Sequence, residues 1–157
     1  MMKLWMSVFL LLILSQAIMC SEVDKYDKTV KQNNENMEMD TIRLSVKGRM
    51  FTVVLEKNSS AEALLELLEK GDMSVEMEDY ARMEKVGSLG VRLPRNDKPI
   101  STGPGDLILY QGHYLVIYYD HNSYSFTPMG KITNVTQEEL KEVLGNGNVT
   151  VTLSSRK

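Results

Sequence analysis

The chain has 157 residues, enough for one domain with a modest core, and its formal net charge is -3. This acidic balance, with no basic stripe along the chain, excludes a nucleic-acid-binding surface. Cys20 is the only cysteine, so an internal disulfide and a thiol nucleophile within the folded domain are both excluded.

Residues 1–20 have the pattern of a signal peptide or of a lipoprotein-type leader. Lys3 supplies a positive charge, and the apolar run from Leu4 to Met19 is shorter than the ~20 residues of a comfortable membrane span. Small residues favour cleavage after Ala17, whereas Cys20 before Ser-Glu resembles a lipidation site, with an unfavourable Met19 in front of it. An uncleaved anchor is the rival interpretation. The leader predicts an extracytoplasmic protein (secreted, periplasmic or at the cell surface) that meets a membrane only through this leader or a lipid on Cys20.

Residues 21–40 are rich in Asn, Glu, Asp and Lys and lack apolar periodicity, which predicts a flexible tether. The folded domain is expected to span residues 41–157. It begins with apolar alternation over residues 42–46 and 51–55 around Gly48, typical of a half-buried hairpin. Residues Ser59 to Glu62 then have capping-box spacing, and the periodicity after them predicts a helix that stops at Gly71. Alternation over residues 73–78 predicts a further strand.

The middle of the domain contains its most apolar stretch. Residues 80–87 are ambiguous, residues 89–93 are predicted to form a short strand, and the three prolines and two glycines of residues 94–105 predict a loop. Two apolar runs, 107–110 and 114–119, then form a predicted hairpin with Gly112 in its turn. If Gln111 and Gly112 are the loop, one face carries Leu107, Leu109, Tyr114, Val116 and Tyr118. Both faces are apolar, so we expect a core on one side and a helix or loop covering the other.

The last part of the chain predicts two more strands and a helix. Tyr124 and Phe126 form a short strand that Pro128 is expected to end. Residues 136–139 form a second capping box before a short helix closed by Gly145, and alternation over residues 149–153 predicts the final strand. Seven or eight strands with two short helices indicate a mainly β fold, a small antiparallel barrel with helices over its openings.

Five segments of the sequence carry a resemblance to a known family: residues 81–85, 90–94, 103–119, 123–132 and 144–153. They are similar to the small bacterial and archaeal cyclophilin-like proteins, a family without an established biochemical role. The resemblance implies a closed eight-stranded antiparallel barrel capped by two short helices. True cyclophilins are prolyl isomerases that use an Arg from a Phe-rich strand, together with Gln, Trp and His. Here the only Trp is Trp5, and no Arg follows Phe51 closely, so no catalytic residue of that kind can be placed.

Two groups of side chains are candidates for a ligand site. Arg82 and Glu84 belong to the densest charge cluster near apolar strands, in which a guanidinium could bind a carbonyl or a carboxylate; an ion pair that fixes a loop is the simpler explanation. Six aromatic residues fall between residues 110 and 126 and could form a wall, although core and rim are the more common roles of such residues. The ligand-binding candidates are Arg82, Glu84, Tyr110, Tyr118, Tyr124 and Phe126. Because side chains fill the interior of a small barrel, a pocket is expected on its outer face or at its mouth.

Other chemistry has little support in the sequence. His113 and His121 are the only histidines and lack the spacing of a metal motif, so we expect neither a metal nor a cofactor. Asp106 is expected to bond the backbone of the preceding loop. The sequence therefore predicts a non-enzymatic binding module for an unknown peptide or small molecule. The alternative is a peptidyl-prolyl isomerase with a non-standard site, with Arg82 as its catalytic residue.

Overall fold

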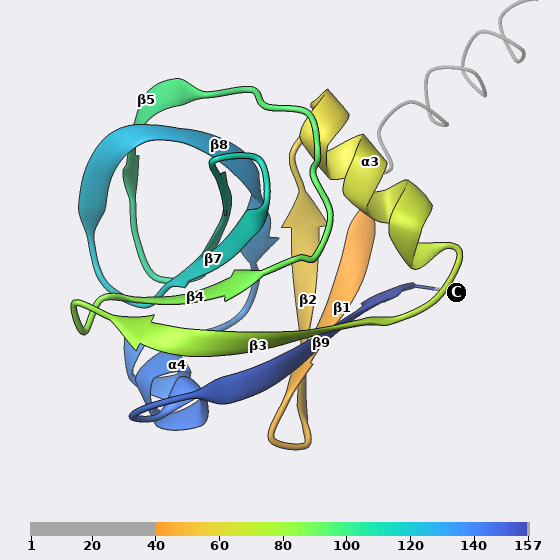
Figure 1. Ribbon diagram of the computed structural model, residues 1–157. Coiled ribbons are helices and arrows are strands. Elements are labelled where there is room, and N and C mark those ends of the chain that lie inside the picture. Colours follow the sequence, from red (N-terminus) through yellow and green to blue (C-terminus); the bar gives the residue numbers. More distant parts are fainter. Residues whose placement is uncertain (1–39, 157) are drawn as a thin grey trace, which may run out of the picture. The chain divides into compact units, whose positions relative to one another are not determined.

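Nine strands and two helices make up residues 40–156, the part of the chain that the computed structural model describes (Figure 1). In chain order they are β1 (Thr41–Val46), β2 (Arg49–Leu55), α3 (Ser59–Leu68), β3 (Met73–Tyr80), β4 (Glu84–Ser88), β5 (Lys98–Thr102), β6 (Asp106–Tyr110), β7 (Tyr114–Tyr118), β8 (Asn122–Ile132), α4 (Gln137–Leu144) and β9 (Val149–Ser155). The predicted leader with Cys20, and the predicted tether up to residue 39, lie outside the described residues. No helix in the described part is long and apolar enough to cross a membrane.

Eight of the strands close into an antiparallel barrel. Neighbouring strands follow the order β2-β1-β9-β3-β4-β7-β6-β8, and pairing between β2 and β8, with Val53 opposite Ile132, returns the sheet to its start. Strand β5 lies outside this ring and pairs with the first half of β8. The predicted fold class, a mainly β, closed eight-stranded antiparallel barrel with two short helices, is confirmed.

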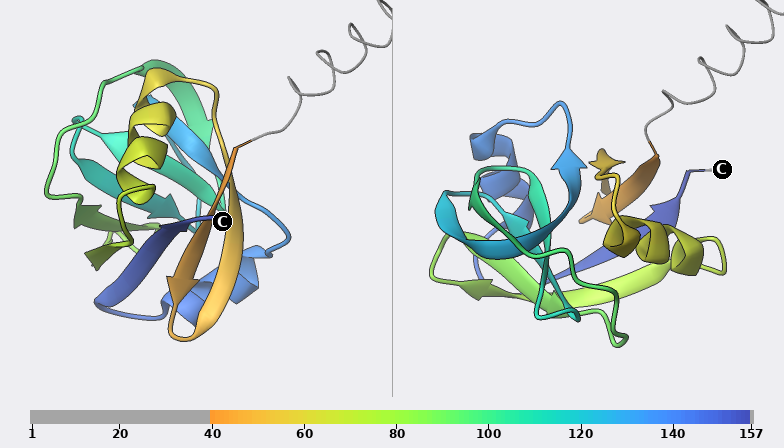
Figure 2. Two further views of the ribbon diagram at one scale, coloured as in Figure 1. Left: turned by 90° about the vertical axis from the view of Figure 1, so that its right-hand side faces the viewer. Right: turned by 90° about the horizontal axis from the view of Figure 1, so that it is seen from above.

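The two helices lie at opposite ends of the barrel in Figures 1 and 2. Each inserts leucines into the inner core, Leu64 and Leu68 from α3 and Leu140 and Leu144 from α4. The predicted capping box of α4 is present, and Gly145 closes this helix with a φ of 65°. The predicted capping box of α3 is wrong. Its N-cap is Asn58, whose side chain accepts hydrogen bonds from the backbone N–H groups of Ser60 and Ala61, both at 3.0 Å, which gives the amide the role expected of the Ser59 hydroxyl.

The central hairpin has a different register from the one expected. Tyr110 pairs with Tyr114 across a three-residue loop in which Gln111 and Gly112 both have positive φ. Leu107, Leu109, Leu115 and Ile117 therefore share the face that points into the barrel, whereas Ile108, Tyr110, Tyr114, Val116 and Tyr118 share the outer face. The loop has three residues, not the two assumed from the sequence. This difference of one residue moves every side chain of the second strand, β7, to the opposite face.

Both faces of this hairpin are covered, as expected, but neither a helix nor a loop covers the outer one. A separate group of buried residues, here called the outer cluster, consists of Ile108, Val116, Tyr118 and Phe126. Phe126 comes from the first half of β8, and Ile100 of β5 packs beside it. The β5–β8 pair, at the upper left of Figure 1, thus forms an arm that folds over the outside of β6 and β7.

Three expected strand boundaries are corrected. Residues 89–93 are not a strand; the ambiguous segment before them contains most of β4. The predicted loop 94–105 contains β5, an edge strand, where Pro99 is tolerated because its missing N–H costs no ladder bond. Pro128 does not end a strand, because β8 continues to Ile132. The register between β6 and β8 shifts at this point, with Ile108 opposite Pro128 and Leu107 opposite Gly130, and such irregularities are where a sheet admits proline.

Candidate functional site

Two consecutive residues of β4 place their charged side chains on opposite faces of the barrel wall. Lys85 points inward and is completely buried. Its Nζ donates to Asp79 Oδ1 and to the carbonyl oxygen of Gly147, both at 2.7 Å, and the Tyr119 hydroxyl donates to the same Asp79 oxygen at 2.6 Å. These bonds, from Lys85 first and from Tyr119 second, lower the pKa of Asp79. The inward charge is therefore fully paired and belongs to the scaffold.

The preceding residue, Glu84, points outward into a pocket. This pocket has a volume of about 340 Å³ and is lined by Tyr80, Glu84, Val86, Tyr110, Tyr114, Val116, Tyr118, Asn122, Tyr124 and Phe126. Glu84, Val116, Tyr118 and Phe126 are buried and form its base, whereas Tyr80 and Tyr124, at 64% and 62% exposed, form its rim. Six of the ten lining side chains are aromatic. We call this cavity the aromatic pocket.

Pairing between strands brings these side chains together. Glu84 lies opposite Tyr118 and Val86 lies opposite Val116 in the β4–β7 ladder. From the covering arm, Phe126 makes ring contacts with Tyr110, Tyr118 and Tyr124, with centroids 6.2, 5.8 and 5.5 Å apart. Edge-to-face and tilted ring pairs at such distances are favourable, so the arm and the outer face of the barrel fix the shape of the pocket.

Glu84 is the unusual member of this pocket. The Tyr118 hydroxyl lies opposite it and acts on its pKa as a hydrogen-bond donor would. The same hydroxyl accepts a hydrogen bond from Asn122 Nδ2 at 3.1 Å. The carboxylate oxygen Oε2 of Glu84 has no hydrogen-bond partner, and among the described residues it is the one buried side-chain polar atom in that condition. Glu84 is only 8% exposed, and burial raises its pKa above the ordinary value, against the opposing effect of the Tyr118 bond. An unpaired buried carboxylate is costly to a fold and is characteristic of binding and catalytic sites.

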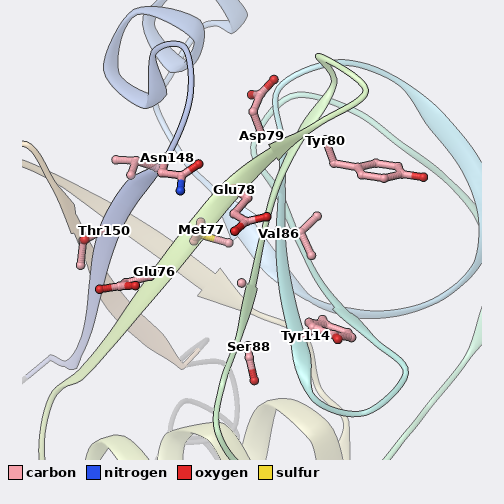
Figure 3. A pocket seen from close by; sticks show the side chains of 12 residues that line it. Glu76, Met77, Glu78, Asp79, Tyr80, Val86, Ser88, Tyr114, Asn148 and Thr150 are labelled. Atoms are coloured by element: carbon pink, nitrogen blue, oxygen red, sulfur yellow. The ribbon is translucent and has the colours of Figure 1, made fainter.

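A second, larger hollow adjoins the aromatic pocket on the outer face of the sheet (Figure 3). It has a volume of about 980 Å³. Figure 3 shows Glu76, Glu78 and Tyr80 along β3, Val86 and Ser88 along β4, Tyr114 beyond them, and Asn148 and Thr150 on the other side. Tyr80, Val86 and Tyr114 line both cavities. Glu76 and Glu78 make this hollow acidic, since Asp79 is paired with Lys85, and neither cavity has a lysine, arginine or histidine in its lining.

Five of the six ligand-binding candidates from the sequence line the aromatic pocket: Glu84, Tyr110, Tyr118, Tyr124 and Phe126. The sixth, Arg82, is exposed in the turn between β3 and β4, has a φ of 53°, and lines neither cavity. Sequence reasoning missed Tyr80, Val86, Tyr114, Val116 and Asn122 as lining residues. The signal that would have found Val86 and Val116 is their position, two residues from Glu84 and Tyr118 on paired strands, which only the correct register reveals.

The remaining polar candidates have local roles. His113 stacks on Tyr114, with ring centroids 4.0 Å apart, and its Nδ1 is 3.1 Å from the Gln111 carbonyl oxygen. His121 Nδ1 lies 3.2 Å from the Thr102 carbonyl oxygen. Within residues 40–156 no group of three or more His, Cys, Asp or Glu side chains is arranged to hold a metal ion. Asp106 accepts a hydrogen bond from the backbone N–H of Gly103 at 2.7 Å, as predicted.

Comparisons with known proteins agree with this architecture. The family model described as "Cyclophilin-like family" matches residues 44–154. The solution structure of a hypothetical protein from Archaeoglobus fulgidus is similar with a TM-score of 0.55 at 14% sequence identity, over 75% of this chain and 95% of that one. At such low identity this likeness concerns the fold alone. The comparison with curated proteins gives no match. Because the family model covers most of the chain, including all or part of every strand of the barrel, the chain belongs to the cyclophilin-like family.

Proposed function

We propose that this protein is a non-enzymatic binding module whose aromatic pocket takes a small organic group, free or carried by a peptide. The observation that carries the proposal is the combination of an aromatic lining with one buried carboxylate oxygen that has no partner. Ligand sites are commonly concave, mostly apolar and supplied with a few polar groups that orient the ligand. The volume of about 340 Å³ is at the lower end of such sites, which suits a single ring or one side chain.

Binding of a neutral ring compound tests this proposal. Benzyl alcohol is titrated into protein with ¹³C-labelled valine methyl groups, and the signals of Val116 and Val86 are followed. We expect saturable shifts at both residues and none at Val53 or Val151, which face the inner core. The absence of shifts at the pocket valines, both with benzyl alcohol and with its charged counterpart benzylammonium, or equal shifts throughout the core, would refute the proposal.

A matched pair of variants shows whether the pocket itself is responsible. Val86→Phe places a larger side chain in the cavity that Val86 lines and is expected to abolish the shift of Val116. Val54→Phe makes the same change on the outer side of β2, at a half-buried residue that lines neither cavity, and is expected to leave binding intact. Loss of binding in both variants would indicate a general effect on folding and would count against the pocket.

The alternative, prolyl isomerisation through Arg82, has no geometric argument in its favour, since the side chain lines neither cavity. A proline-peptide isomerisation assay decides between the two functions. We expect no acceleration at high protein concentration. Acceleration that Arg82→Ala abolishes would overturn the binding-module proposal and establish the isomerase.

We further propose that the protein acts outside the cytoplasm, as a secreted, periplasmic or cell-surface protein. The support is the sequence of residues 1–20, with its short apolar run after Lys3. The intact mass of the protein isolated from its source tests this. An N-terminus at Ile18 or Ser21 indicates signal cleavage, an acylated N-terminus at Cys20 indicates a lipoprotein, and a full-length cytoplasmic product would contradict export.

A further inference from the structure

The unsatisfied Glu84 Oε2 specifies what kind of group the aromatic pocket accepts. A carboxylate oxygen that is buried without a partner needs a hydrogen-bond donor. The pocket does not provide one, because Oε2 has no partner although Tyr118 and Asn122 lie close by in the hydrogen-bond chain. A ligand that enters the pocket can supply this donor.

The charges around the pocket favour a cation as that ligand. Glu84 is the one charged residue in the lining, and the adjoining hollow adds the carboxylates of Glu76 and Glu78, whereas Asp79 is neutralised by Lys85. Lys85 does not neutralise Glu84, because it lies on the opposite face of β4, beside the inner-core residue Ile117, and its Nζ is bonded to Asp79. A cation entering this region meets negative charge from both cavities and no opposing positive charge in either lining.

The aromatic walls add to the same preference. Aromatic ring faces carry negative potential and attract cations, more strongly when water is excluded. Six rings line the pocket. Tyr118 and Phe126 at the base are buried, so the attraction at that depth acts in a partly desolvated setting.

The hydrogen-bond geometry selects among cations. A guanidinium binds a carboxylate best through two parallel hydrogen bonds to both oxygens, but the Tyr118 hydroxyl, opposite Glu84 in the β4–β7 ladder, competes with it as a donor to that carboxylate. A quaternary ammonium has no N–H to offer to Oε2. A primary ammonium is a compact charge with several N–H donors, and it can satisfy a single oxygen.

We infer that the aromatic pocket recognises a primary alkylammonium group, which donates an N–H to Glu84 Oε2 while its carbon chain lies among Tyr110, Tyr118 and Phe126. This inference rests on the proposed binding function and names its ligand class. The ammonium group can belong to a small amine or to a lysine side chain of a peptide.

A comparison of three ring compounds of similar shape tests the inference: benzylammonium, neutral benzyl alcohol and benzyltrimethylammonium. Dissociation constants are measured on the whole protein near neutral pH by the valine methyl shifts described above. We expect benzylammonium to bind about tenfold or more tightly than either of the others, as befits one buried charge-assisted hydrogen bond. Equal affinities for all three would overturn the ammonium inference and leave the pocket in place. No binding of any probe would overturn the proposed function as well.

Two variants locate the effect at Glu84. Glu84→Gln keeps the shape of the side chain and removes its charge, so benzylammonium is expected to lose its advantage while benzyl alcohol binds as before. Glu78→Gln makes the same change at an exposed residue that lines only the adjoining hollow and is expected to change affinity less than about twofold. An advantage for benzylammonium that survives Glu84→Gln would refute the assigned contact. If this variant does not fold, the three-probe comparison on the unaltered protein decides by itself.

Two further probes distinguish the sources of the ammonium group. Butylammonium represents a small amine, and N-acetyl-lysine methylamide represents a lysine within a peptide. Comparable affinity for both supports a peptide ligand, and binding of butylammonium alone supports a small amine. Binding of neither, while benzyl alcohol still binds, would overturn the ammonium inference.

Discussion

Replacement of Glu84 by Gln is expected to make the unliganded protein more stable at neutral pH. The carboxylate is 8% exposed and its Oε2 has no partner. The amide of Gln is neutral and similar in shape, and it can still accept the hydrogen bond from Tyr118. The substitution therefore removes a buried, unpaired charge without opening a cavity.

The size of this gain in stability follows from the unpaired state of Glu84 Oε2. Leaving a buried polar group unsatisfied costs about 1–3 kcal/mol, and more when the group is charged. The Gln amide also lacks one partner, so we expect a net gain of about 1–2 kcal/mol in the free energy of unfolding. For a domain of this size each kcal/mol corresponds to roughly 4 °C in the melting temperature.

The stability advantage of the Gln variant must also increase as the pH rises. Burial raises the pKa of Glu84 in the folded protein above its ordinary value, which applies to the unfolded chain. At a pH between these two pKa values the folded state keeps a proton on Glu84 that the unfolded state has lost. The free energy of unfolding of the native protein then falls as the pH rises through this interval. Below the ordinary pKa both states are protonated, and the difference between the native protein and the Gln variant is expected to disappear.

Urea denaturation of both proteins at several values between about pH 4 and about pH 8 measures this effect. We expect the two stabilities to converge at the acid end and to separate with the variant more stable at the neutral end. Equal or lower stability of the variant at neutral pH would refute the description of Glu84 as a buried, unpaired charge. A stability difference that does not change with pH would refute its ionisation as the cause.

Two further substitutions test the scaffold around the site. Lys85→Met removes the fully buried cation and leaves Asp79 without its ion-pair partner, so we expect the free energy of unfolding to fall by about 3 kcal/mol. A loss below about 1 kcal/mol would contradict the scaffold role assigned to Lys85. Gly87→Ala adds a Cβ that would lie 2.4 Å from the backbone oxygen of Glu76, so chemical denaturation should show a loss of about 1–3 kcal/mol. The matched change Gly71→Ala meets nothing within 4 Å and should be neutral or slightly stabilising; equal effects of the two alanines would contradict the close approach of β3 and β4.

The barrel could be predicted because its interior follows local rules. Alternation of apolar residues and the two helical periodicities depend on neighbours in the sequence, and they identify most strands and both helices. Asn58 was missed as an N-cap because the serines after it satisfy the same rule, and only the observed bonds to Ser60 and Ala61 separate the two.

The arm that builds the pocket could not be predicted in the same way. β5 and the first half of β8 contain Pro99 and end near Pro128, and both prolines favoured loops or strand ends. Proline is acceptable at both places because Pro99 lies on an edge strand and Pro128 lies at a register shift. Both features depend on which strands pair, and strand pairing is a property of the whole fold.

Residue type alone identified most of the candidate site. The lining residues that were missed depend on the register between paired strands, which could not be predicted. Tyr110, Tyr118, Tyr124 and Phe126 stand out as a cluster of aromatics, and they do meet around one cavity. The unpaired state of Glu84 Oε2 has no signature in the sequence, because it depends on what the strands opposite do and do not provide.

The titration of Glu84 itself, followed through its side-chain carboxyl ¹³C signal with and without benzylammonium, tests the central claim most directly. If an ammonium group donates to Oε2, it binds the ionised carboxylate, and the raised pKa of the free protein must fall when the ligand is present. If benzylammonium binds to the protein and the pKa of Glu84 does not change, the ligand is bound elsewhere and the account is contradicted.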